Sequence, residues 1–222
     1  MTQRISLKEA ERKAFRSMFQ DGIWDIYLGS LLLLMGLGPV MGSKLEDGSM
    51  TIPGILGLLV GVACIPMLGF WASKKFITTP RIGLVEFGPA RKAKRKKVRL
   101  ILSVSVLVGV VMALVGLVMA NNPPTWVSVA WLIPAGIWGI NSVVVFSLGA
   151  YYLDFPRAYI YGWLYALPFP TSILLYESFD LPLIMPYAVV SGGMMLVGLV
   201  LFIRFLRDYP LPERRLYDGP NG

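Results

Sequence analysis

Residues 100–153 read LILSVSVLVGVVMALVGLVMANNPPTWVSVAWLIPAGIWGINSVVVFSLGAYYL and contain no charged side chain. A helix crosses the hydrocarbon core of a bilayer with about 20 apolar residues, so this stretch is too long for one span. It divides at Asn121-Asn122-Pro123-Pro124, a turn signal that a lipid-exposed helix would not contain. Four more uncharged stretches lie at 26–43, 48–73, 158–176 and 181–203. The sequence therefore predicts an all-α integral membrane protein with six transmembrane helices, at about 23–42, 52–73, 100–120, 126–150, 159–176 and 183–204.

The composition agrees with this class and excludes several kinds of site. Of the 222 residues, 55% are hydrophobic and 15% are charged, and the mean hydropathy is +0.63. A soluble domain carries roughly 25% charge. The chain has no histidine, which excludes Ser-His-Asp and Cys-His nucleophiles and histidine-ligated zinc or haem, and its single cysteine, Cys64, lies inside a predicted span. We expect no catalytic site, no cofactor and no metal.

The basic residues predict the orientation of the spans. With the spans placed as above, all of the 21 lysines and arginines except Lys44 fall on one side. The positive-inside bias puts this side in the cytoplasm, together with both termini. The membrane domain, 23–206, then follows a cytoplasmic segment 1–22, contains a basic cytoplasmic loop 74–99 and precedes a cytoplasmic tail 207–222. The compact loops favour a prokaryotic cell membrane.

Prolines repeat with the spans. One proline opens each even-numbered span and another follows it after 22 to 27 residues, in the pairs Pro53 and Pro80, Pro134 and Pro156, and Pro186 and Pro210. Proline at the first turn of a helix loses no hydrogen bond, and a later proline favours its end. This pattern predicts three helical hairpins, each entering from the cytoplasm and returning to it. The alternative is that prolines simply mark the ends of membrane helices.

The N-terminal segment 1–22 contains an amphipathic pattern. Ser6 and Glu9 have the spacing of a capping box, and six apolar residues from Leu7 to Phe19 fall on one broad helix face. We expect an amphipathic helix that lies in the membrane interface and leads into the first span. The alternative is a helix that docks on a partner.

Basic side chains at the cytoplasmic surface are candidates for binding lipid phosphates. Residues 91–99 contain seven lysines and arginines, which an anionic leaflet would attract. The segment 76–88, which contains Arg81, is expected to be extended or a small hairpin. Anionic lipid is the expected partner; nucleic acid is not, because no aromatic residues are interleaved with the basic ones. The alternative role is a topogenic anchor. The candidates are Arg81, Arg157, Arg91, Lys92, Lys94, Arg95, Lys96 and Lys97.

Polar residues inside the predicted spans are candidates for a second kind of site. The fifth span is interrupted by two prolines followed by hydroxyl side chains, and the fourth contains an Asn-Ser pair. Together these residues predict a polar pocket; the alternative is that they are kinks and interhelical contacts. They are Asn141, Ser142, Pro168, Pro170, Thr171 and Ser172. Asp25 and Asp154, near the cytoplasmic ends of spans, are candidates for a bound cation or an ion pair with an arginine.

Three functions from different classes follow. The first is a non-catalytic membrane module that binds lipids or protein partners, as an accessory or assembly subunit or as a homo-oligomer. The second is a small transporter or channel for an uncharged or weakly charged solute, which would use the interrupted fifth span and Asn141. The third is a lipid-modifying enzyme at the inner leaflet, which would need a metal held by carboxylates. The first is preferred because the chain lacks common catalytic groups.

Overall fold

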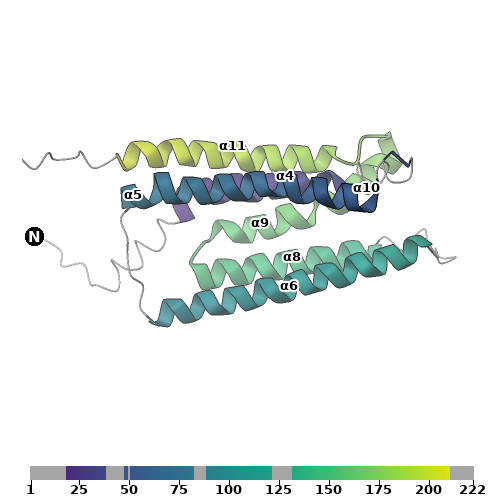
Figure 1. Ribbon diagram of the computed structural model, residues 1–222, viewed down its shortest axis with the longest axis horizontal. Helices are drawn as coiled ribbons and strands as arrows, with labels where there is room; N and C mark the ends of the chain where they lie inside the picture. The colour runs from purple at the N-terminus through teal and green to yellow at the C-terminus, as the bar shows by residue number, and fades with distance from the viewer. Residues whose placement is uncertain (1–18, 39–47, 50, 83–88, 122–131, 211–222) are drawn as a thin grey trace, which may run out of the picture.

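A computed structural model describes residues 19–38, 48–49, 51–82, 89–121 and 132–210, and every regular element in these ranges is a helix (Figure 1). The predicted amphipathic helix, apart from its last residues, and the tail from 211 onward lie outside the described residues. The elements are α2 (Ile23–Gly36), α4 (Ile52–Ser73), the π-helix η1 (Lys74–Thr78), α5 (Thr79–Ile82), α6 (Pro89–Asn121), α8 (Leu132–Leu153), α9 (Arg157–Ala166), α10 (Pro168–Phe179) and α11 (Met185–Asp208).

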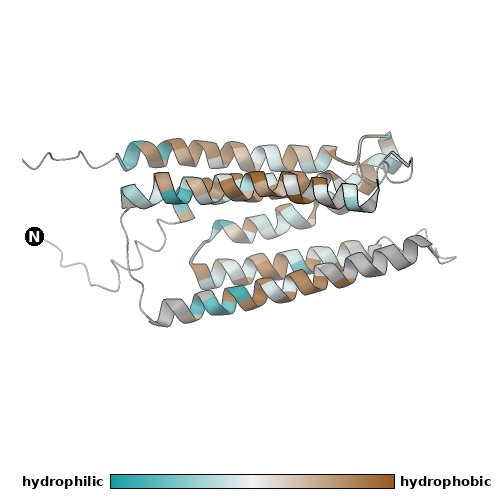
Figure 2. Cartoon of the chain, in the orientation of Figure 1, coloured by the Kyte–Doolittle hydropathy of each residue, from teal (hydrophilic) through white to brown (hydrophobic). Residues whose placement is uncertain are grey.

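Three stretches of helix in the described part of the chain are long and apolar enough to cross a membrane: Val60–Arg81, Ala135–Leu153 and Met185–Asp208. Their apolar side chains face outward, as Leu196 at 66% and Ile65 at 68% exposure illustrate. Figure 2 shows hydrophobic residues along most of α4 and α11, with hydrophilic ones at the end where α11 finishes. Exposing apolar side chains on several faces of a bundle is unfavourable in water, whereas the hydrocarbon of a bilayer solvates them. The chain is a membrane protein with a helical fold.

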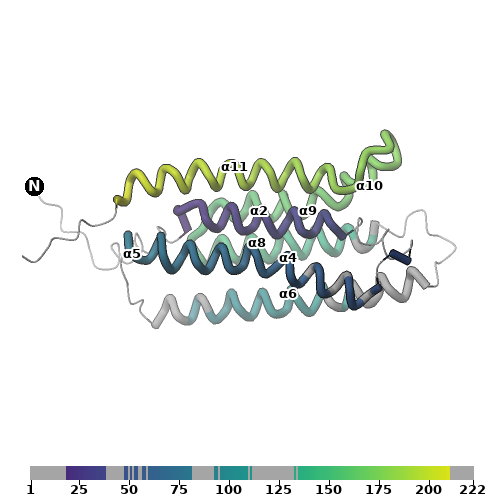
Figure 3. The backbone as a smooth tube through the Cα atoms, turned by 45° about the horizontal axis from the view of Figure 1, so that its top comes forward, coloured from purple at the N-terminus to yellow at the C-terminus, as the bar shows by residue number. Residues whose placement is uncertain are grey.

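The helices run side by side and form two groups (Figures 1 and 3). In one group, α2 packs against α11 and α4; in the other, α8 packs against α6 and α9. We call them the α2 group and the α8 group. The helix α10 continues from α9 and packs against α11, so it joins the groups at one end of the molecule. At the opposite end, which we call the basic end, α6 and α9 begin and α11 ends (Figure 1).

The closest contact inside the α2 group lies where α2 crosses α11. A Cβ added at Gly198 would lie 2.8 Å from the backbone nitrogen of Ile26 and 2.9 Å from the Cβ of Asp25. Gly22, which caps α2 with a φ of +74°, faces the same part of α11. Glycine lets the two backbones approach as closely as they do, as it does at other helix crossings in membranes.

We expect Gly198→Ala to lower the free energy of unfolding by about 1–3 kcal/mol, because the new methyl group would overlap the Ile26 backbone nitrogen and the Asp25 Cβ, neither of which can move without shifting α2. Gly193→Ala on the same helix is the control: nothing lies within 4 Å of its added Cβ, and alanine is the better helix former. Thermal unfolding in detergent measures both. Equal melting temperatures would show that the crossing is looser than described.

The structure corrects the predicted loop 74–99 and the extended segment 76–88 where it describes them, at 74–82 and from Pro89 onward; residues 83–88 lie outside the described residues. Residues 74–82 continue the helix of α4 through η1 and α5, and α6 already begins at Pro89, so the basic cluster 91–99 lies on a helix. The physical reason is that lysine, arginine and alanine favour helix and that a proline is tolerated at the first helical position. The fifth predicted span is divided between α9 and α10 at Leu167, immediately before Pro168.

Candidate functional site

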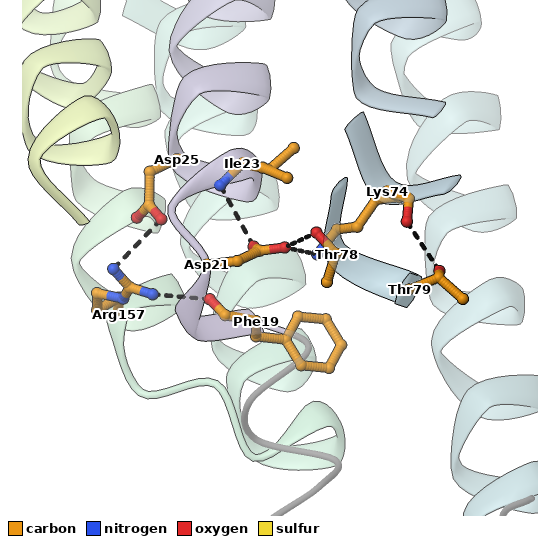
Figure 4. Close-up of polar contacts among 8 residues, drawn as sticks. All are labelled: Phe19, Asp21, Ile23, Asp25, Lys74, Thr78, Thr79 and Arg157. Carbon is orange, nitrogen blue, oxygen red and sulfur yellow. Dashed lines mark hydrogen bonds and ion pairs between the residues drawn. The ribbon is translucent and has the colours of Figure 1, made fainter. Parts of the chain in front are cut away.

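Two aspartates at the start of α2 are completely buried (Figure 4). The Asp21 carboxylate accepts a hydrogen bond from the backbone of Ile23 at 3.3 Å. Its other oxygen accepts from Lys74 Nζ at 2.6 Å and from Thr78 Oγ1 at 2.8 Å. A buried charge needs such partners, because an isolated carboxylate in a low-dielectric interior is costly. Asp21 therefore fixes the end of the long α4–α5 helix against the start of α2.

The π-helix presents the partners of Asp21. Within η1, Lys74 and Thr78 are the first and last residues, and both side chains reach the same carboxylate oxygen. The Lys74 carbonyl accepts the backbone N–H of Thr79, the π-type bond, and also accepts from the Thr79 side chain at 2.8 Å (Figure 4). Single π turns occur frequently at functional sites, because they re-aim side chains that an α-helix would place elsewhere.

Asp25 pairs with an arginine of the other helix group. Arg157 Nη1 lies 3.2 Å from Asp25 Oδ2, and Arg157 Nη2 donates to the Phe19 carbonyl at 2.7 Å (Figure 4). The ion pair with an arginine is one of the two alternatives predicted for Asp25. Asp154, the other predicted acid, lies in the turn between α8 and α9 with a φ of +52°. Arg157 thus connects the α8 group to the α2 group at the basic end.

Arg81 has a different role from Arg157. Its Nη1 donates to the carbonyls of Leu206 at 3.3 Å and Tyr209 at 2.7 Å, which belong to the last turn of α11 and the residue after it. Cations near the end of a helix satisfy free carbonyls and interact favourably with the helix dipole. The Arg81 side chain therefore binds the end of α11, whereas the Arg157 side chain binds the start of α2. The structure does not bring the two arginines together at one ligand site.

One face of α6 presents lysines followed by apolar residues. Lys94 and Lys97 are exposed near the start of the helix, and Lys97 Nζ lies 5.7 Å from the centre of the Tyr152 ring on α8. At 100° per residue, Val98, Ile101 and Ser105 continue along the face that these lysines begin. Lys96, also exposed, falls on the opposite face. Of the side chains of Arg91, Lys92 and Arg95 nothing is described.

A cavity of about 310 Å³ lies between the two helix groups. Its lining comes from α2, α6, α8 and α9, together with residues next to them, and is nearly all apolar. The face of α6 described above forms one wall, and Gly149 of α8 lies in another. The volume is at the lower end of the range for small-molecule sites. The apolar residues of its lining include Trp24, Leu28, Val98, Ile101, Leu102, Val145 and Phe146.

A second apolar cavity, of about 230 Å³, lies further from the basic end. Trp138 and Asn141 line both cavities. The Trp138 indole donates to the Tyr165 carbonyl at 3.1 Å, and the Tyr165 hydroxyl donates to the Leu28 carbonyl at 2.5 Å. These bonds hold the wall between the cavities in place and add a second link between the α8 and α2 groups.

The predicted polar pocket is only partly assembled. Asn141 lines the first cavity and donates to Ser105 on α6 at 3.0 Å, and its neighbour Ser142 is buried beside it. Thr171 and Ser172 instead donate to carbonyls of their own helix region, at 2.8 Å to Leu167 and 2.7 Å to Phe169. Pro168 and Pro170 interrupt the backbone there and line neither cavity.

Several residues of the site were not among those predicted. Asp21, Lys74 and Thr78 were not predicted, although Lys74 is the first charged residue after a long apolar stretch, a place where a lysine needs an acidic partner or the membrane surface. Ser105, Trp138 and Tyr165 carry no signal that separates them from ordinary span residues. Their roles depend on contacts between helices that are distant in sequence.

No protein-family model, curated protein or solved structure matches this chain. Among the residues that the structure describes, no group of three or more acidic or cysteine side chains could hold a metal ion.

Proposed function

We propose that this protein is a non-catalytic membrane module that binds one anionic phospholipid at the basic end. The phosphate interacts with Lys94 and Lys97, and one acyl chain occupies the cavity of about 310 Å³ between the helix groups. As part of the proposal, the chain crosses the membrane six times as three hairpins, with the basic end and both termini in the cytoplasm. The positive-inside bias supports this orientation.

The observation that carries the proposal is the order of residues along one face of α6. Lysines come first, and apolar residues that line the cavity follow them. From Lys94 to Ser105 the helix rises about 16 Å, at 1.5 Å per residue. A phospholipid has the same order along its length, a charged headgroup followed by an apolar chain. Each lysine contributes about 1 kcal/mol of attraction near an anionic surface.

The lining of the cavity favours a lipid chain over a polar solute. A cavity with apolar walls stays dry, so its walls lack contacts until an apolar group fills it. Ser105, Asn141 and Ser142 bring polar side chains to the walls, and the polar groups of Trp138 and Tyr165, which also line the cavity, already donate to backbone carbonyls. A transporter for a polar solute would need more hydrogen-bonding groups along its path. The same lining offers no acid-base pair for chemistry on the lipid.

We expect the double variant Lys94→Gln/Lys97→Gln to lose about tenfold in its preference for phosphatidylglycerol over phosphatidylcholine, because two charges leave the end of the site. Native mass spectrometry from nanodiscs of mixed composition measures the preference. The control is Lys75→Gln/Lys96→Gln, which removes the same charge: Lys75 Nζ lies over the Trp71 ring at 4.7 Å on α4, and Lys96 is on the opposite face of α6. An equal loss in the control would mean that only total charge matters and would reject this site.

A further inference from the structure

A polar pair lies in the apolar region between the two cavities. Asn141 Nδ2 donates to Ser105 Oγ at 3.0 Å, and Asn141 lines both cavities. The amide also has a carbonyl oxygen that accepts hydrogen bonds, and the serine hydroxyl has a proton to donate. Within the described residues the structure gives Asn141 no further hydrogen bond. The pair therefore offers an acceptor and a donor to whatever occupies the cavity.

Such groups are costly beside hydrocarbon unless a partner meets them. An amide or hydroxyl without a hydrogen bond in an apolar environment costs roughly 1–3 kcal/mol in proteins. An acyl chain without a polar group leaves the Asn141 carbonyl oxygen and the Ser105 hydroxyl proton without hydrogen-bond partners. A hydroxyl group on the chain would donate to Asn141 Oδ1 and accept from Ser105, which satisfies both. The hydroxyl would gain as well, since in the surrounding bilayer it has no such partners.

We infer that the site selects a phospholipid with a hydroxyl group near the middle of one acyl chain. This inference rests on the proposed function, because it concerns the lipid in the same cavity. The position of the hydroxyl follows from α6: the Ser105–Asn141 pair lies about 16 Å along the helix from Lys94, which places it well inside the chain region and far from the glycerol backbone.

The test is a competition between two phosphatidylglycerols that differ only in a hydroxyl at carbon 12 of one chain. Both are supplied in equal amounts in nanodiscs, and native mass spectrometry counts the lipid retained by the full chain. We expect the hydroxylated lipid to be retained about fivefold more, the effect of roughly one net hydrogen bond. Asn141→Leu and Ser105→Ala should each bring the ratio of hydroxylated to plain lipid on the retained chains close to one, whatever the total amount of lipid that the variant retains.

Ser103→Ala is the matched control, because the Ser103 hydroxyl is exposed on α6 and donates to the Arg99 carbonyl of the same helix at 2.9 Å. Ser103→Ala should leave the preference for the hydroxylated lipid unchanged. If Asn141→Leu fails to fold, Ser105→Ala still tests the inference. Equal retention of the two lipids by the wild type would overturn the inference and leave lipid binding standing. Retention of neither lipid would overturn the proposed function itself.

Discussion

The variant Arg157→Leu is expected to lower the free energy of unfolding by about 3–5 kcal/mol, the cost of leaving a buried charge without its partner. Asp25 is completely buried and lies 3.2 Å from the guanidinium. The variant also loses the bond from Arg157 to the Phe19 carbonyl, which helps to hold the start of α2. Both contacts join the two helix groups. Unfolding in mixed micelles, followed by circular dichroism, measures the loss.

Two further variants separate the buried pair from a surface one. Arg204→Leu removes an arginine whose carboxylate partner, Asp208, lies 3.7 Å away with both side chains more than half exposed. We expect a change below about 1 kcal/mol there. The double variant Asp25→Leu/Arg157→Leu should recover much of the loss, because it leaves no buried charge behind. Equal effects of Arg157→Leu and Arg204→Leu would contradict the importance of the buried pair.

The second large effect is expected on lipid retention when the cavity is filled. Gly149 lines the cavity, and nothing lies within 4 Å of a Cβ added there. In Gly149→Leu the new side chain can therefore enter the cavity without a clash and occupy the volume of the acyl chain. We expect retained phospholipid to fall at least about tenfold, because filling the site removes the chain's contacts with its walls. The stability of the lipid-free protein should stay the same or rise.

Gly136→Leu is the matched control for this variant. Gly136 lies on the same helix, α8, also has nothing within 4 Å of an added Cβ, and does not line the cavity. Both substitutions add the same apolar side chain to the same helix. A loss of lipid with Gly136→Leu as large as with Gly149→Leu would place the retained lipid elsewhere, on the outer surface of the bundle.

Local sequence signals predicted the helices and some of the site. The uncharged stretches predicted helices that the structure contains over most of their length, because the period and length of apolar stretches are local properties. The prolines at 168 and 170 predicted the break in the fifth span. Pairing of Asp25 with an arginine was predictable as an alternative, since a buried carboxylate near a helix end requires a cation.

Contacts between distant segments were beyond the sequence alone. The prolines predicted hairpins of neighbouring spans, yet α2 packs most extensively against α11, and α8 against α9. The hydrogen bond between Asp21 and Thr78 joins residues 57 positions apart and depends on a π turn that no sequence pattern predicted. The apolar cavity arises from the way the two helix groups meet, so no single segment encodes it.

The most direct test of the account is native mass spectrometry of the protein, extracted from its own membrane into nanodiscs, with Gly149→Leu measured beside the wild type. The account predicts one anionic phospholipid on each wild-type chain after the nanodisc is stripped, and a bare chain for the variant. A wild-type chain that retains no lipid would contradict it. A stoichiometric second protein in place of lipid would also contradict it, and would make the chain an accessory subunit of that partner.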